Sequence, residues 1–143
     1  YEHGVIPIVN ENDSVATDEV EYGEKKLLGD NDSLSAVVAC LVKADLLIIL
    51  SDVDGFYSGD PRKGADCKII DDIYAIDEQI TACAGGRGTK LGTGGMVTKL
   101  DAARLVMEEG IDMVLANGND PERIYDILDG EKVGTVFVGK SKV

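Results

Sequence analysis

A run of five consecutive apolar residues at 46–50 constrains the fold more than any other part of the chain. A strand that is apolar on both faces must be covered on both faces, as the central strands of parallel sheets are. Shorter apolar runs occur at 5–9 and 113–116, a last strand is predicted over 133–138, and helical patterns separate these segments. Strands that alternate with helices predict an α/β fold, a three-layer α/β/α sandwich with a mostly parallel sheet.

The predicted helices follow from the spacing of apolar residues. Residues at i, i+3, i+4 and i+7 are apolar in 34–41, and one apolar face repeats through 96–109. A shorter helix is expected at 76–84, and a helix over 120–128 begins with proline at its first helical position. The charged, irregular stretch 15–29 is expected to form a flap or hairpin on the surface.

Composition narrows the classes of partner. At 143 residues, with 44% apolar and 29% charged residues, the chain has the make-up of one ordinary globular domain. Its formal net charge of −13 argues against nucleic acids and anionic membranes as partners, because both are polyanions. An acidic protein that binds phosphate must gather its few cations locally, so any lysine beside a glycine-rich loop is of interest.

Cysteine and histidine usage argues against a zinc site or a disulfide framework. Cys40, Cys67 and Cys83 are odd in number and lack a C-x-x-C pair, and His3 is the single histidine. No apolar run reaches the roughly 18 residues that span a bilayer, and no signal peptide is visible. We therefore expect a cytoplasmic location. Because the chain begins at Tyr1 rather than at methionine, we also expect it to be part of a longer protein.

Dense polar patches follow two of the predicted strands. Residues 10–14 (Asn-Glu-Asn-Asp-Ser) follow the first strand, and 51–57 follow the strand at 46–50. Ligands bind at the carboxyl ends of strands in open α/β sheets, although Asn and Asp also favour plain turns. A third patch, 29–33, precedes a predicted helix and holds more capping residues than a cap needs, which favours a second role in binding substrate or cations.

A glycine-rich loop at 87–95 runs directly into the helix predicted over 96–109. Free N–H groups and the helix dipole at such a junction suit an anion, and Thr93, Thr98 and Lys99 add hydroxyls and an ammonium group. The pattern is that of a phosphate site. A plain connecting loop is the alternative, because glycine-rich loops are common connectors. A lysine in the first helical turn opposes the dipole, and a residue that breaks a local rule points weakly to function.

Two formal motif matches are rejected on context. Residues 134–141 match G-x-x-x-x-G-K-[ST], but their apolar residues lie inside the pattern, where a P-loop needs a strand before it and a helix after it. Asp52 and Asp54 suggest a calcium loop, yet Phe56 stands where the EF-hand needs Asp or Asn.

Four motifs together resemble the glutamate 5-kinases, the proline-biosynthesis branch of the amino acid kinase family. They occur in the family's order, at 7–13 (PIVNEND), 29–32 (GDND), 51–55 (SDVDG, followed by DPR) and 92–99 (GTGGMVTK). The aspartate-glycine loop with DPR is shared with sister kinases. The first and last motifs are the specific ones, and similar loops occur in the kinase half of bifunctional pyrroline-carboxylate synthases.

The resemblance implies phosphorylation of the γ-carboxylate of L-glutamate by ATP, with Mg²⁺ bridging the phosphates. It also implies proline as feedback inhibitor and a homo-oligomer in the full-length protein. Relative to the family, residues 1–143 look like the C-terminal, nucleotide-side half of the kinase domain, without the N-terminal half or the RNA-modification-like domain that many members carry. A non-catalytic nucleotide or amino-acid sensing module, or a sister kinase, is the alternative.

The resemblance also assigns roles by motif position. Lys99 looks like one of two transition-state lysines, and Asp32 like the carboxylate that orients them. Asp13 and Asn31 look like the glutamate-binding pair, with Asn10 as a further candidate. No protein ligand for a metal is assigned. The expected nucleotide contacts are Ser51, Asp52, Thr93, Gly94, Gly95, Met96, Val97, Thr98 and Lys99.

Overall fold

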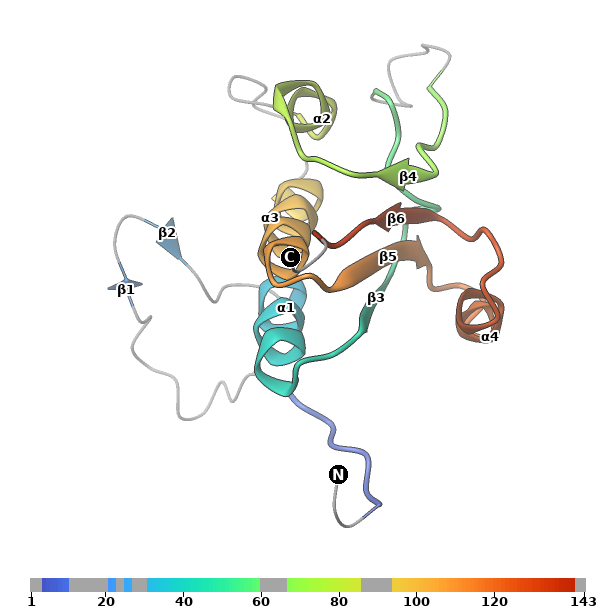
Figure 1. Cartoon of the computed structure of the whole chain (residues 1–143). Helices are drawn as coiled ribbons and strands as arrows, with labels where there is room; N and C mark the ends of the chain where they lie inside the picture. Colours follow the sequence, from blue (N-terminus) through green and yellow to red (C-terminus); the bar gives the residue numbers. More distant parts are fainter. Residues whose placement is uncertain are drawn as a thin grey trace.

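The computed structural model describes residues 4–10, 21–22, 25–26, 31–59, 67–85 and 94–140 (Figure 1). In chain order its elements are β1 (Glu21–Tyr22), β2 (Lys25–Lys26), α1 (Asn31–Val42), β3 (Leu46–Ser51), β4 (Asp72–Ile73), α2 (Glu78–Cys83), α3 (Gly94–Glu108), β5 (Asp112–Asn117), α4 (Arg123–Leu128) and β6 (Thr135–Phe137). No helix among the described residues is long and apolar enough to cross a membrane.

The main sheet has four strands in the order β3-β5-β6-β4. Strands β3 and β5 are parallel along their full length, with Leu46 opposite Asp112 and Ser51 opposite Asn117. Strands β4 and β6 are also parallel, whereas β5 and β6 are antiparallel. The predicted mostly parallel sheet is confirmed, with one antiparallel pairing. The hairpin expected within 15–29 is present as the antiparallel pair β1–β2, and the rest of that stretch lies outside the described residues.

Helices cover both faces of the sheet, as predicted. Because side chains alternate along a strand, Met113 and Leu115 of β5 face α1 and α3, while Val114 and Ala116 face the other way. The second face is covered by Ile127 of α4, which closes a smaller cluster. In Figure 1 α1 and α3 lie on one side of the sheet and α4 on the other. The result is the three-layer arrangement.

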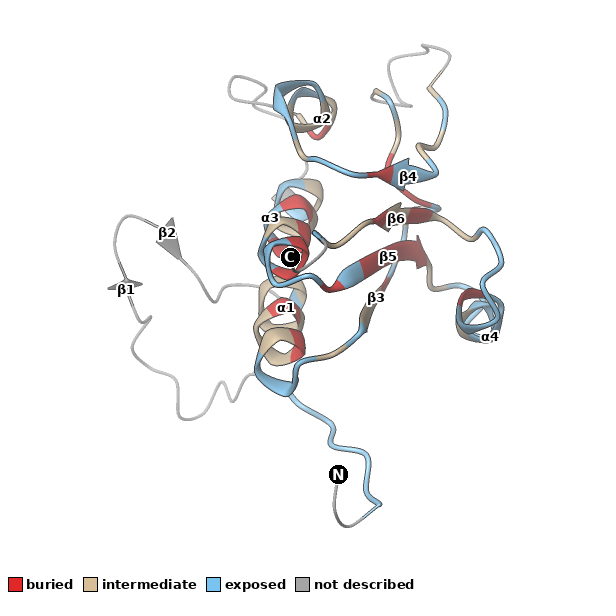
Figure 2. Ribbon diagram, in the orientation of Figure 1, coloured by how far each residue is buried: buried red, intermediate tan, exposed pale blue. Residues whose placement is uncertain are grey.

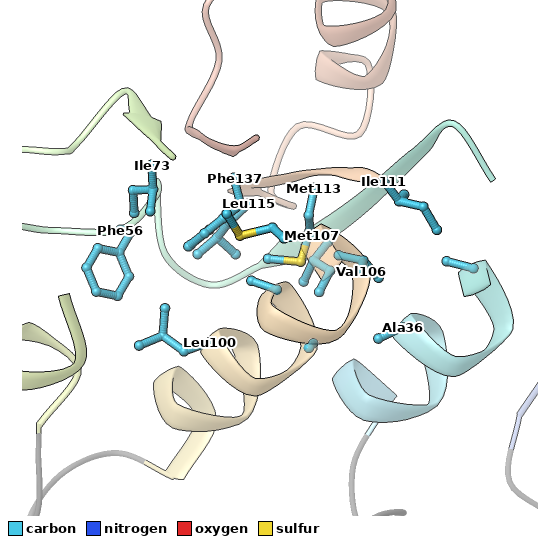
Figure 3. Close-up of a cluster of buried hydrophobic side chains, with 14 of the residues drawn as sticks. Ala36, Phe56, Ile73, Leu100, Val106, Met107, Ile111, Met113, Leu115 and Phe137 are labelled. Carbon is cyan, nitrogen blue, oxygen red and sulfur yellow. The ribbon is translucent and has the colours of Figure 1, made fainter. Parts of the chain in front are cut away.

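The larger core lies between the sheet and the helix pair α1–α3. Figure 3 shows the side chains of β5 and β6 pointing toward α3, which contributes Leu100, Val106 and Met107. Ala36 of α1 and Ala103 of α3 have no exposed surface, and such small side chains allow two helices to approach closely. The rings of Phe56 and Phe137 meet edge to face with 6.1 Å between centroids.

The prediction of a buried strand at residues 5–9 is wrong in this structure. The segment pairs with no described strand, and Ile6 and Ile8 are 91% and 97% exposed (Figure 2). It runs beside α1 and β3 and borders an apolar groove of about 810 Å³ with them. An apolar run becomes a buried strand only when a neighbouring strand accepts its hydrogen bonds, and Pro7 already lacks one donor.

Three other predicted elements begin or end at different residues. The helix predicted over 76–84 is α2, which begins after Asp77, whose carboxylate accepts a hydrogen bond from the N–H of Ile80 at 2.9 Å. The strand predicted over 133–138 shortens to the three residues of β6. Pro121 lies in a turn before α4 rather than in its first helical turn, because the helix begins only at Arg123.

Candidate active site

The topology brings the starts of two helices to the edge where two strands end. Helix α1 leads into β3 and α3 leads into β5, each through a short turn that reverses the chain. Because β3 and β5 are parallel, the N-terminal ends of both helices lie near the carboxyl ends of both strands. Asn31 and Asp32, the start of α3 and the loop after Ser51 are therefore placed at one edge, where open α/β sheets bind ligands.

Lys99 and Asp32 form a sheltered ion pair between the two helices. The distance from Lys99 Nζ to Asp32 Oδ2 is 3.0 Å, and the two side chains are only 13% and 17% exposed. The Thr98 hydroxyl lies 3.1 Å from the same carboxylate oxygen. Lys99 and Asp32 are 67 positions apart in the sequence. Packing of α1 against α3 makes the cluster.

The cluster is also tied to the backbone of its own helices. Lys99 Nζ lies 3.4 Å from the carbonyl oxygen of Gly95, and the Thr98 hydroxyl lies 2.9 Å from the same atom. On the other helix, the Ser35 hydroxyl donates to the carbonyl of Asp32 at 2.7 Å. Because α3 begins at Gly94, Lys99 lies past the first helical turn rather than within it as predicted, and its counter-charge is the carboxylate of Asp32.

A second group of polar side chains lies in the loop that follows β3. The Ser51 hydroxyl donates to Asp52 Oδ1 at 3.1 Å, and the side chain of Asp52 is exposed. Asp54 accepts hydrogen bonds from Tyr57 at 3.2 Å and from Asn117 at 2.7 Å. Partial burial raises the pKa of the Tyr57 phenol, and the hydrogen bond to Asp54 and its negative charge raise it further. The phenol therefore stays protonated at neutral pH and donates to Asp54.

The remaining predicted site residues are placed as follows. Asn31 is exposed at the start of α1, and Asn10 is exposed in the segment before it. Gly95 lies at the start of α3, and no described residue comes within 4 Å of where its Cβ would stand. Val97 is 41% exposed, whereas Met96 packs against the main core. Gly94 is the first residue of α3, and Asp13 and Thr93 lie outside the described residues.

Asp54, Tyr57 and Asn117 were not assigned a role from the sequence. In the motif SDVDG only the first two residues are predicted nucleotide contacts. Asn117 belongs to a polar Asn-Gly-Asn turn at the end of the strand that is β5 in the structure. The available signal was that both polar turns follow strands. That signal indicates a shared site only when the two strands are neighbours, because polar residues at the ends of adjacent parallel strands lie close together.

A family model described as the amino acid kinase family matches residues 1–117. The chain is 56% identical over 139 residues to glutamate 5-kinase from Clostridium perfringens (strain 13 / Type A), a match that covers 97% of this chain and 51% of that protein. The chain thus spans about half the length of the curated relatives it matches.

Solved structures with the same arrangement include two kinases. Uridylate kinase from Archaeoglobus fulgidus superimposes with a TM-score of 0.58 at 31% identity, over 77% of this chain and 47% of that chain. Isopentenyl phosphate kinase from T. acidophilum superimposes with a TM-score of 0.53 at 32% identity, over 74% and 38%.

Proposed function

Because the chain belongs to the amino acid kinase family, we propose that the protein containing it transfers the γ-phosphoryl group of ATP to the γ-carboxylate of L-glutamate. This is the first step of proline biosynthesis. The observation that carries the proposal is the sheltered Lys99–Asp32 pair between the adjacent N-terminal ends of α1 and α3. The 56% identity to a glutamate 5-kinase supports glutamate as the acceptor.

The reaction needs positioning and positive charge rather than acid or base catalysis. A carboxylate oxygen of glutamate attacks the γ-phosphorus, the bond from that phosphorus to the β-γ bridging oxygen breaks, and ADP leaves with the electron pair. Since the attacking carboxylate is already ionised, no proton has to be removed. Alignment of the two substrates and cations beside the transferring group supply most of the acceleration.

Lys99 is the residue we assign to that charge. Its ammonium group is held 3.0 Å from Asp32 and is largely withdrawn from solvent, so it is oriented before substrate arrives. Asp32 acts as a positioning residue in this proposal, because its carboxylate also lies within reach of the Thr98 hydroxyl. A fixed cation stabilises the charge that spreads over the phosphoryl oxygens in the transition state more than it stabilises bound ATP.

The binding roles follow from the same edge of the sheet. We assign Ser51 and Asp52 to the nucleotide, and the stretch from Thr93 to Lys99 to its phosphates, where the free N–H groups of a helix start suit an anion. Asp13 and Asn31 are assigned to glutamate. The exposure of Asn31, Asp52 and Gly95 is compatible with these roles.

Magnesium belongs to the proposal as the partner of ATP. Within the described ranges no group of three or more His, Cys, Asp or Glu side chains is arranged to hold a metal ion. Such a group is not required, because Mg²⁺ in kinases takes most of its ligands from substrate phosphates and water. When bound with ATP it neutralises phosphate charge.

The extent of the protein is part of the proposal as well. A chain that spans about half the length of its relatives and carries the nucleotide-side residues is assigned to the C-terminal half of the kinase domain. Proline as feedback inhibitor, a homo-oligomeric assembly and a cytoplasmic location complete the assignment.

The test is an acceptor panel with the full-length protein. ADP release and hydroxamate formation are measured with ATP and Mg²⁺ in the presence of glutamate, aspartate or acetylglutamate. We expect glutamate to give the highest kcat/KM. Preference for aspartate or acetylglutamate would make the protein a sister kinase. Nucleotide binding without turnover on any of the three acids would favour a non-catalytic sensing module.

A further inference from the structure

Asp54 joins the loop after β3 to the end of the neighbouring strand β5. One carboxylate oxygen, Oδ1, accepts from Asn117 Nδ2 at 2.7 Å, and the other, Oδ2, accepts from the Tyr57 hydroxyl at 3.2 Å. The two donors lie on different segments, one at the end of β5 and one inside the loop. Asp54 therefore links the course of the loop to a strand of the sheet.

Asn117 uses both ends of its side-chain amide. Its Nδ2 donates to Asp54, and its Oδ1 accepts from the backbone N–H of Asn119 at 2.8 Å. The adjacent N–H of Gly118 donates to the carbonyl of Ser51 at 2.7 Å. The amide is thus fixed from its own strand end while it holds Asp54, and the same turn holds the backbone of Ser51.

The far end of the loop is held by β6. Phe56 N–H donates to the buried hydroxyl of Thr135 at 2.7 Å. Gly55 packs so closely that a Cβ there would stand 2.9 Å from both Thr135 Oγ1 and Ile69 Cγ2. The loop from Ser51 to Phe56 is anchored at both ends, and Asp54 is its attachment in the middle.

We propose that Asp54 and Asn117 are positioning residues for nucleotide binding: they hold the loop that presents Ser51 and Asp52. The inference rests on the proposed function, which assigns those two residues to ATP. Among the described residues, the hydrogen-bond partners of the Lys99–Asp32 pair lie on α1 and α3 and do not include Asp54 or Asn117. A loop that is already ordered binds its ligand without the entropic cost of being ordered at that moment.

The consequence is a separation of KM from kcat. Asn117→Ala frees the middle of the loop, so the KM for ATP and the Kd for the non-hydrolysable analogue AMP-PNP are expected to rise about fivefold, in line with the net contribution of one ordinary hydrogen bond. Chemistry in the bound complex depends on Lys99, so kcat is expected to stay within about twofold.

A conservative variant separates geometry from charge. Asp54→Asn keeps an oxygen that can accept from Asn117, whereas Asp54→Ala removes it. We expect Asp54→Ala to lose at least as much affinity as Asn117→Ala, because it also removes the acceptor of the Tyr57 hydroxyl, and Asp54→Asn to recover most of the affinity. Asn119→Ala is the matched control, because its backbone N–H is retained and its side chain makes no hydrogen bond to a described residue.

The experiment measures AMP-PNP binding by calorimetry in the presence of Mg²⁺, together with steady-state kinetics and melting temperature, on the full-length protein. Unchanged Kd and KM in Asn117→Ala would overturn the positioning role and leave the proposed function intact. An equal loss in Asn119→Ala, or a fall in kcat with KM unchanged, would also overturn it. If the wild-type protein binds no AMP-PNP, both proposals fall.

Tyr57→Phe, which removes a single hydroxyl, is measured alongside as a milder variant and is expected to raise Kd less than Asn117→Ala.

Discussion

At the scale of single residues, Lys99 shows how a tertiary contact fixes the position of a charge. The lysine lies past the first turn of α3, which begins at Gly94, so the helix dipole does not decide its placement. Asp32, from another helix, supplies the opposite charge at 3.0 Å. The two together form a preorganised group, and neither would be stable in the same place without the other, since a sheltered charge needs a partner.

We predict that Lys99→Ala in the full-length protein lowers kcat by roughly three orders of magnitude with a modest change in KM for ATP, because its charge acts mostly in the transition state. Steady-state kinetics of glutamate phosphorylation measure both constants. Lys132→Ala is the control, because that side chain is 80% exposed and pairs only loosely with Asp72, at 3.9 Å. An unchanged kcat in Lys99→Ala, with the protein folded, would remove Lys99 from the mechanism.

At the scale of elements, the antiparallel pairing of β6 with β5 depends on one glycine. Gly134 has a φ of +69°, and a Cβ there would overlap the carbonyl oxygen of Leu115 in β5. The residue allows the chain to turn tightly against β5 before Thr135 pairs with Leu115. Only glycine combines that backbone conformation with so close an approach to the neighbouring strand.

We predict that Gly134→Ala lowers the free energy of unfolding by about 2–4 kcal/mol, from the strained backbone and the steric overlap together. Gly130→Ala is the matched control, since Gly130 also has positive φ, +83°, but no described residue lies within 4 Å of a Cβ there. Its cost is expected to be about 1 kcal/mol, from the left-handed backbone alone. Urea denaturation of both variants measures the difference, and equal losses would show that the packing against β5 is unimportant.

At the scale of the whole molecule, an acidic protein of net charge −13 places the sheltered cation Lys99 at the edge where β3 and β5 end. The arrangement follows from the parallel pairing of β3 and β5. Because each strand is preceded by an antiparallel helix, the N-terminal ends of α1 and α3 lie at the same edge of the sheet. In the proposed function this edge supplies the nucleotide side of a two-substrate site. Catalysis by alignment requires both sides at once.

We predict that the 143-residue chain by itself binds AMP-PNP weakly and turns over glutamate at less than about 1% of the rate of the full-length protein, because the proposed function assigns the chain only the nucleotide side of the site. Hydroxamate assays at equal molar concentration make the comparison, with calorimetry as the check on binding. Turnover close to that of the full-length protein would contradict the division of the site. Absence of turnover in both would instead count against the proposed function.

The sequence by itself determined the elements whose formation is local. The apolar runs at 46–50 and 113–116 predict strands, and both form paired strands in the structure, because an unbroken apolar stretch has to be buried wherever the chain goes. The helical spacing within 34–41 and 96–109 likewise located α1 and α3. Polar residues after the strands located the edge where a ligand is expected.

Only the tertiary structure decided which of these parts meet. The Lys99–Asp32 contact spans 67 positions and the Asn117–Asp54 contact spans 63, and no local pattern encodes such distances. The same limit explains why the prediction of a buried strand at residues 5–9 is wrong. The segment is apolar, but no described strand pairs with it. Burial of a strand depends on the neighbour that accepts its hydrogen bonds, and that neighbour is set by the path of the whole chain.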